Sequence, residues 1–262
     1  MKLSVSNIAW SPERDETVLN LLKQHGLSGV EIAPTRLFPE APYDKIPEAK
    51  ALKNDLETRF KLEISSMQSI WYGVSDRIFG TAEERTRLTA YSHAAIGFAE
   101  AINCQNLVFG CPKNRSLPDG ADPETALPFF RELGEYAKTH HTVVAMEPNP
   151  PIYNTNYINT TREALSLIRE VDSEGFRLNL DVGTMVENRE DVSVLEDSEH
   201  LIHHVHISEP GLAPIQQRAL HKELAAFLRA FGYQGWVSIE VKRQDDPDGL
   251  RRMMDYVAGL FA

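Results

Sequence analysis

The sequence predicts an α/β fold, a single (β/α)8 TIM barrel that occupies residues 1–262 as one domain. Three observations support this prediction. Short apolar runs typical of strands alternate with longer helical patterns, eight such runs occur, and no Ser/Gly-rich linker or low-complexity tract interrupts them. Because a helix between successive strands returns the chain to the same edge, the strands are expected to be parallel, and eight repeats favour closure.

The strand candidates follow one another along the whole chain: residues 2–8, 28–33, 61–67, 106–110, 142–147, 176–181, 202–207 and 236–240. Between them, apolar residues recur three and four positions apart, as in 123–140, 161–171 and 215–231, which predicts amphipathic helices. Gly232 follows the last of these as the expected C-cap. An open dinucleotide-binding sheet is the rival fold, but the segment after the first strand, NIAWSPERDE, contains no glycine.

Composition and charge argue against nucleic acids and membranes as binding partners. A formal net charge of −11 argues against nucleic acid, since phosphate binding requires a clustered basic surface. No apolar run approaches the roughly 20 residues of a membrane span, and the first ten residues lack the apolar core of a secretory signal. Cys104 and Cys111 form no metal spacing and no disulfide framework. We therefore expect a cytoplasmic protein with no membrane or nucleic-acid partner, and a homo-oligomer is compatible with the same features.

Polar residues stand where the last four predicted strands end. These residues are Glu147, Asp181, His206 and Glu240, separated by 34, 25 and 34 residues, about one strand-and-helix unit each. In a (β/α)8 barrel the active site lies at the carboxyl ends of the strands, so all four side chains are expected on one rim.

Three carboxylates and one imidazole in a concave site would repel one another unless a cation held them. Oxygen-rich donors with one nitrogen suit Mn²⁺, Mg²⁺ or a similar divalent ion. A single acidic residue after a strand is more often a helix N-cap or a solvated loop group, but three acidic residues and a histidine at four successive strand ends favour a metal. His204 shares a strand face with His206 and is interpreted as a hydrogen-bonded core residue, whereas His203 points the other way.

The motifs AMEPNP, LNLDVGTM, HVHISEPG and GYQGWVSIEVK resemble the strand-5 to strand-8 signatures of the xylose-isomerase-like barrels, the sugar phosphate isomerase/epimerase superfamily. That superfamily includes ketose 3-epimerases, hydroxypyruvate isomerases, inosose dehydratases and endonuclease IV enzymes. The resemblance implies that Glu147, Asp181, His206 and Glu240 bind one divalent ion. Mn²⁺ is the expected ion, with Mg²⁺, Co²⁺ or Zn²⁺ as alternatives, and Glu147 and Glu240 would also be the catalytic acid and base.

The resemblance implies a metal-dependent isomerase or epimerase of a sugar, a sugar phosphate or a related polyol. A Lewis-acidic ion would stabilise the enediolate formed when a proton leaves the carbon next to a carbonyl. Return of a proton to the same carbon from the opposite face inverts it, and transfer to the neighbouring carbon isomerises. Two alternatives stay open: a lyase or dehydratase on the same scaffold, similar to inosose dehydratase, and a non-catalytic sugar-binding barrel.

The sequence departs from two branches of the superfamily. Endonuclease IV enzymes need additional zinc-binding histidines, and the regions SSMQSIWYG and VFGCPKNR contain none. Thr184 stands where many epimerases carry a substrate-contacting histidine, and HISEPGLAPI lacks the arginine that follows strand 7 in those enzymes. These departures favour a different polyol.

Further residues are candidates for substrate binding. Lys113 and Arg115 could hold a phosphate or carboxylate, with a solvated loop as the alternative. Gln68 and Trp71, with Tyr72, could hydrogen-bond and stack a sugar, although aromatic residues there could equally pack beneath a loop. Thr184 is a candidate by its position after Asp181, and His221 could reach the site if its helix begins near the rim.

Overall fold

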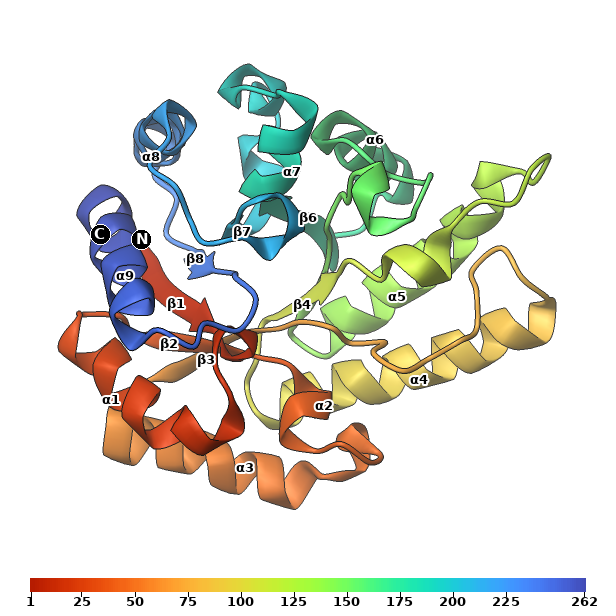
Figure 1. Cartoon of the computed structure of the whole chain (residues 1–262). Helices are drawn as coiled ribbons and strands as arrows, with labels where there is room; N and C mark the ends of the chain where they lie inside the picture. The colour runs from red at the N-terminus through yellow and green to blue at the C-terminus, as the bar shows by residue number, and fades with distance from the viewer.

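The computed structural model describes the backbone of residues 1–262 and every side chain except that of Pro247. Eight parallel strands form a closed barrel in sequence order, and the last strand pairs with the first, which confirms the predicted (β/α)8 fold. Figure 1 shows the strands at the centre of the molecule with the helices arranged around them. The strands are β1 Lys2–Ser6, β2 Gly29–Ile32, β3 Glu63–Met67, β4 Asn106–Phe109, β5 Val143–Met146, β6 Phe176–Asp181, β7 Ile202–Ile207 and β8 Trp236–Ile239.

Local sequence signals mark the starts of α4 and α6 and the end of α8. α4 and α6 both start with a capping box, in which Thr81 pairs with Glu84 and Thr160 with Glu163. α8 ends at Gly232, whose φ of +81° is a conformation that glycine adopts without strain, as expected. The helices are α1 Asp15–Gln24, α2 Pro34–Leu37, α3 Ile46–Asp55, α4 Ala82–Ala101, α5 Leu127–Thr139, α6 Thr161–Val171, α7 Val182–Asn188, α8 Ala219–Phe231 and α9 Pro247–Phe261.

Most elements lie within their predicted ranges but are shorter than them, and for β1 and α8 specific contacts explain the difference. β1 stops at Ser6 because Asn7–Ala9 form a 3-10 turn, in which the Asn7 side chain accepts a hydrogen bond from the backbone N–H of Ala33 at 2.9 Å. α8 begins at Ala219, four residues after the predicted start. The preceding residues run towards Glu209, which binds the Arg218 side chain, so side-chain contacts override the local helical pattern.

Apolar side chains form a continuous core that includes the space between the barrel and its helices. Around Phe109 of β4, for example, Trp71 and Phe130 pack edge to face at ring distances of 4.7 and 5.2 Å. The interior of the barrel is unusual because it also holds charged groups. Glu31 of β2 contacts His204 and His206 of β7, a strand that does not pair with β2, so these side chains meet across the barrel.

Irregularities in strand pairing lie beside two of these polar positions. The β2–β3 register shifts between Val30 and Glu31, and the β6–β7 register shifts between Leu178 and Asn179. Such irregularities re-aim side chains and are common near active sites. Here they coincide with Glu31 and Asn179, both of which contact the groups described below.

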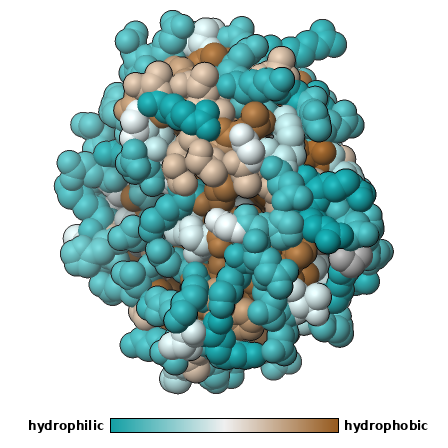
Figure 2. Space-filling model, turned by 90° about the vertical axis from the view of Figure 1, so that its left-hand side faces the viewer, coloured by the Kyte–Doolittle hydropathy of each residue, from teal (hydrophilic) through white to brown (hydrophobic). Residues whose placement is uncertain are grey.

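The outer surface is largely hydrophilic. On the face seen from the side of α8, α9 and α1, hydrophilic side chains predominate, and hydrophobic ones gather in patches between them (Figure 2). Among the described residues, no helix combines the length and apolar character needed to cross a membrane.

Candidate functional site: a candidate metal centre at the barrel mouth

The four residues singled out at the strand ends converge. Glu147 follows β5, Asp181 ends β6, His206 lies in β7 and Glu240 follows β8. One donor atom from each side chain lies within 4.8 Å of the donor atoms of the other three, and all four residues are buried. The structure therefore brings together as one cluster residues that span almost one hundred positions of sequence.

His206 lies at the centre of this cluster and uses both ring nitrogens. Its Nδ1 lies 2.9 Å from Oε1 of Glu147 and 3.3 Å from Oε2 of Glu240. Its Nε2 lies 2.8 Å from Oε2 of Glu31. Nδ1 is therefore the nitrogen that faces the carboxylates, and Nε2 is engaged on the other side of the ring.

Side-chain amides orient the two glutamates. Asn179 donates to Oε1 of Glu147 at 2.8 Å, and Asn149 donates to Oε2 of the same residue at 3.0 Å. The amide nitrogen of Gln68 lies 3.0 Å from Oε1 of Glu240. Groups held by several hydrogen bonds have little rotational freedom, so these carboxylates are organised before any ligand arrives.

Asp181 is held by the start of the helix that follows it. Its Oδ2 accepts from the backbone N–H of Thr184 at 2.7 Å, so Asp181 is the N-cap of α7, and it lies 2.8 Å from the Thr184 hydroxyl. Its Oδ1 accepts a hydrogen bond from the hydroxyl of Ser208. A helix N-cap was the alternative explanation for an acidic residue after a strand. Asp181 is such an N-cap, and it also faces the cluster.

Burial and mutual repulsion shift the protonation of the cluster. Burial, reinforced by Glu147, raises the pKa of Asp181 to about 6, although His206 opposes the shift. Burial also raises the pKa of Glu240 to about 7, again against the opposing effect of His206. Burial alone would lower the pKa of His206, but Glu31, Glu240 and Glu147 raise it well above its usual range. The carboxylates therefore stabilise a proton on Nδ1 of His206. A metal cation at the same position would relieve the repulsion among these carboxylates in the same way.

The donor set fits a divalent metal ion. Three carboxylates and one imidazole nitrogen match the ligands of Mn²⁺ and similar ions, and the raised pKa values of Asp181 and Glu240 show the cost of holding these groups together without a cation. Glu31, His204 and His206 form a second such group, which shares His206 with the first. We interpret Glu31 as the hydrogen-bond partner of a metal-binding histidine, because it contacts Nε2 while Nδ1 faces the other carboxylates.

A small pocket opens onto the cluster. This inner pocket encloses about 200 Å³ and is lined by Glu147, Asp181, Glu240, Gln68, Asn149 and Tyr153, among others. The Tyr153 hydroxyl accepts a hydrogen bond from the backbone N–H of Gly211 at 2.9 Å, which ties this wall to the loop after β7. His206 is fully buried, so a ligand in the inner pocket meets carboxylates and amides first.

The other predicted substrate-binding residues divide into two groups. Gln68 lines the inner pocket, and Trp71 and Lys113 line a neighbouring cavity. Thr184 is fully buried, and its hydroxyl lies 2.8 Å from both Asp181 and the carbonyl of Pro148, so the structure places it behind a predicted ligand. His221 is also fully buried, within α8 and against the Tyr256 hydroxyl at 3.1 Å, rather than at either pocket.

Arg115 points into the protein, although Lys113 in the same loop is exposed. Its guanidinium donates to the carbonyl of Glu147 at 2.9 Å, to the Asn149 side chain at 2.9 Å and to the carbonyl of Ile158 at 3.3 Å. Burial lowers its pKa to about 10. This placement connects the loop after β4 to the loop after β5 and gives no support to the expected contact with a substrate phosphate or carboxylate.

Several residues at the site were not predicted from the sequence. Glu31, Asn149, Asn179 and Tyr153 all contact the cluster or line its pocket. Glu31 carried a recognisable signal, because it is a charged residue in the middle of the apolar run SGVEIA. His204 is buried in the core as expected, but the expected hydrogen bond is absent, because neither ring nitrogen has a partner among the described residues and Oε2 of Glu31 lies 3.4 Å from Nε2. Burial lowers the pKa of His204.

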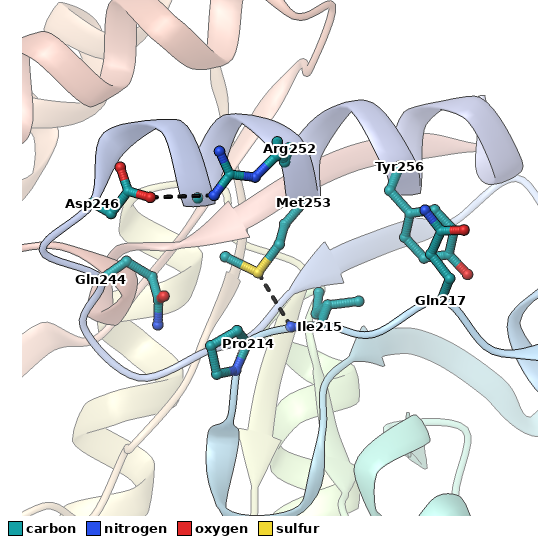
Figure 3. A pocket seen from close by; sticks show the side chains of 9 residues that line it. Pro214, Ile215, Gln217, Gln244, Asp246, Arg252, Met253 and Tyr256 are labelled. Carbon is teal, nitrogen blue, oxygen red and sulfur yellow. Dashed lines mark hydrogen bonds and ion pairs between the residues drawn. The ribbon is translucent and has the colours of Figure 1, made fainter.

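A separate groove lies between the loop that precedes α8 and the start of α9 (Figure 3). It encloses about 330 Å³ and contains an ion pair between Asp246 and Arg252 at 3.2 Å. Met253 projects into it, and its sulfur accepts from the backbone N–H of Ile215 at 3.2 Å. The groove shares no residue with the metal cluster, so the inner pocket remains the site where titratable groups converge.

Known proteins share this architecture. The chain is similar in fold to the solved D-psicose 3-epimerase from Clostridium cellulolyticum H10, with a TM-score of 0.80, 16% identity, and coverage of 100% of this chain and 99% of the other. The 3-keto-D-glucoside 4-epimerase from E. coli gives a TM-score of 0.78 at 22% identity and covers 99% of each chain. An AP endonuclease, family 2, from Brucella melitensis gives 0.76 at 18% identity, also over 99% of each chain.

At these identities the likeness shows a common fold alone, and no curated protein matches the sequence. The family model described as the xylose isomerase-like TIM barrel matches residues 19–259, which is nearly the whole chain. This match agrees with the resemblance of the strand-end motifs. The chain belongs to the xylose isomerase-like TIM barrel family.

Proposed function

We propose that this protein is a divalent-metal-dependent epimerase or isomerase of a sugar or related polyol. The observation that carries the proposal is the pairing of Glu147 and Glu240, two carboxylates that both face Nδ1 of His206 and both line the inner pocket. Solved proteins of similar fold include a D-psicose 3-epimerase and a 3-keto-D-glucoside 4-epimerase, which supports the same class of reaction.

The ion would be held by Glu147, Asp181, Glu240 and Nδ1 of His206. Mn²⁺ is the ion we expect, and the same donors accept Mg²⁺, Co²⁺ or Zn²⁺. When bound, such an ion supplies Lewis-acid stabilisation of the negative charge that develops on a substrate carbonyl oxygen.

The two glutamates would move the proton. One carboxylate takes a proton from the carbon next to a carbonyl, and the electron pair of the broken C–H bond shifts towards the carbonyl oxygen. The other, as a carboxylic acid, returns a proton to the same carbon for epimerisation. For isomerisation it returns the proton to the former carbonyl carbon, while the hydroxyl proton of the first carbon moves to the former carbonyl oxygen. No atom is lost in either outcome, so the product has the mass of the substrate apart from exchanged hydrogen.

The charge of the site favours an uncharged substrate over a phosphorylated one. Arg115 is turned inward, and among the described residues that line the inner pocket and its neighbour, Lys113 is the one cationic side chain. A phosphate ordinarily requires several donors, such as paired arginines or backbone N–H groups. We therefore assign the reaction to neutral sugars.

The test is turnover of a panel of ketoses and keto-sugars by the Mn²⁺-loaded protein in D₂O, followed by proton NMR and mass spectrometry. We expect an epimer or isomer that carries deuterium at the reacting carbon. A product that has lost water would identify a dehydratase, and absence of turnover across the panel would favour a non-catalytic sugar-binding barrel.

A matched pair of variants connects turnover to the cluster. Glu240→Gln keeps the size of the side chain but removes the carboxylate, so it should abolish turnover. Glu63→Gln makes the same change at an exposed ion pair with Lys2, at the opposite end of β3 from the site, and should leave turnover intact. Full activity in Glu240→Gln would refute the assignment.

A further inference from the structure

A second cavity adjoins the inner pocket. This outer pocket encloses about 530 Å³ and is formed by the loops after β3 and β4. Ser69, Cys111 and Pro112 line both pockets, so the two cavities meet along these residues. The inner pocket, at about 200 Å³, is smaller than the roughly 300–1,000 Å³ typical of small-molecule sites. The outer pocket is more than twice as large as the inner pocket.

The junction between the two pockets has a constrained backbone. Ser69 and Cys111 have φ values of +54° and +44°, in the left-handed region that residues other than glycine seldom occupy. Such conformations persist where the surroundings enforce them, and they cluster at ligand sites. The Ser69 hydroxyl also donates to Oε1 of Gln68 at 3.0 Å, and the amide of Gln68 contacts Glu240. The junction is therefore connected to the catalytic carboxylates.

The two walls of the outer pocket are joined to each other. Nδ2 of Asn114, in the loop after β4, donates to the carbonyls of Val74 and Asp76 at 2.9 and 2.8 Å. The backbone N–H of Ile78 returns a hydrogen bond to the carbonyl of Asn114 at 2.9 Å. These bonds connect the loop after β4 to the loop after β3, so the outer pocket is formed before a ligand binds.

The surface of the outer pocket suits a neutral ring. Trp71 is anchored beneath it by a hydrogen bond from its Nε1 to Ser92 at 3.0 Å, while Tyr72 is 72% exposed. An exposed aromatic ring beside a catalytic pocket offers a flat apolar face, and Lys113 adds hydrogen-bond donors. A mostly apolar wall with a few polar groups is typical of small-molecule sites.

We propose that the outer pocket binds the second ring of a glycoside whose first ring reacts in the inner pocket. The inference rests on the proposed function, because it takes the inner pocket as the place of proton transfer. A glycosidic bond occupies the anomeric carbon, so the carbonyl that acidifies the transferred proton lies at another ring carbon. The substrate class is therefore a keto-glycoside with a ring-bearing aglycone, rather than a free ketose.

Binding of two keto-glycosides tests this assignment without depending on turnover. The Glu240→Gln variant, which keeps three of the four metal ligands, is held at saturating Mn²⁺ and titrated by calorimetry with a methyl keto-glucoside and with the corresponding phenyl keto-glucoside. We expect the phenyl compound to bind about threefold to tenfold more tightly, the range expected for an aromatic contact. Equal affinities, or no measurable binding of either compound, would refute the outer site.

Substitution of Tyr72 tests where that preference arises. In the otherwise unchanged protein, Tyr72→Ala should remove most of the kcat/KM preference for the phenyl over the methyl compound. Phe231→Ala, which truncates another exposed aromatic residue at the end of α8, should keep the preference. A preference retained in Tyr72→Ala refutes the outer site. Turnover of free ketoses without any preference for glycosides would also refute the outer site, but it would support the proposed function. Phenyl selectivity in binding without turnover of any sugar would refute the proposed function alone.

Discussion

Glu31 and His206 come from β2 and β7, two strands that do not pair, and meet inside the barrel, with Oε2 of Glu31 2.8 Å from Nε2 of His206. Both side chains are fully buried. The histidines outweigh the effect of burial and lower the pKa of Glu31, so its carboxylate stays ionised. An ionised acceptor on Nε2 keeps the proton there, and Nδ1 is left to face the metal cluster.

Glu31 is therefore predicted to be a positioning residue for metal binding. Glu31→Gln removes the charge that orients His206 and should weaken Mn²⁺ affinity by about tenfold to a hundredfold. Calorimetric titration of the metal-free protein measures this directly, and Glu63→Gln is the control for loss of a glutamate charge. Unchanged Mn²⁺ affinity in a folded Glu31→Gln protein would show that the contact does not orient the ligand.

Metal affinity should depend on pH. The pKa values of Asp181 and Glu240 are raised from 3.8 and 4.5 to about 6 and about 7, so both carboxyls hold protons in weakly acidic solution. A metal ion must displace those protons, and affinity should rise as pH increases from 5.5 to 7.5, by up to roughly tenfold per pH unit for each proton displaced. Titrations in buffers of different ionisation enthalpy measure the protons released. An affinity that stays constant over this range would contradict the prediction.

The fold was predictable because it depends on periodic local signals. Each of the eight predicted strands contains a strand of the barrel, and the helical pattern at 161–171 matches α6, where Thr160 and Glu163 form the capping box. The limits of elements were less predictable. The Asn7 side chain binds the backbone of Ala33, and Arg218 binds Glu209, so contacts with other segments decide where β1 ends and α8 begins.

The site was partly predictable for a geometric reason. Residues at the carboxyl ends of parallel strands must share one rim, so their convergence follows from position alone. Contacts across the barrel, such as that of Glu31, depend on strand tilt and register, which the sequence does not display. The same limit of sequence-based prediction applies within one loop. Lys113 is exposed and Arg115 is fully buried, although the same role was expected for both residues from the sequence.

Thr184 is predicted to act on the metal site rather than on substrate. Its hydroxyl lies 2.8 Å from Oδ2 of Asp181, so Thr184→Val should weaken Mn²⁺ affinity by about tenfold, and Thr184→Ser should retain it. Excess Mn²⁺ should restore the KM of Thr184→Val, because the defect lies in metal binding. A KM that stays raised at saturating Mn²⁺ would instead indicate substrate contact.

Arg115 is predicted to stabilise the fold. Arg115→Met leaves the carbonyl of Glu147 and the side chain of Asn149 without their donor, and buried acceptors without a partner are costly. We expect the free energy of unfolding, measured with urea, to fall by about 2–4 kcal/mol. Lys113→Met, two residues earlier on the exposed side of the loop, should change it little. Equal effects of the two substitutions would contradict the inward placement of Arg115.

Gly110 is predicted to be required for the position of Glu147. A Cβ atom at Gly110 would lie 2.8 Å from Oε2 of Glu147, closer than van der Waals contact allows. In Gly110→Ala this carboxylate must move away from Asn149, which now donates to it, so both Mn²⁺ affinity and kcat should fall at least roughly tenfold while the barrel stays folded. Gly97→Ala, within α4 and with no atom within 4 Å of the added carbon apart from the adjoining helix backbone, is the matched control and should retain both. Circular dichroism separates this outcome from unfolding, and a Gly110→Ala protein with full metal affinity would show that Glu147 tolerates displacement.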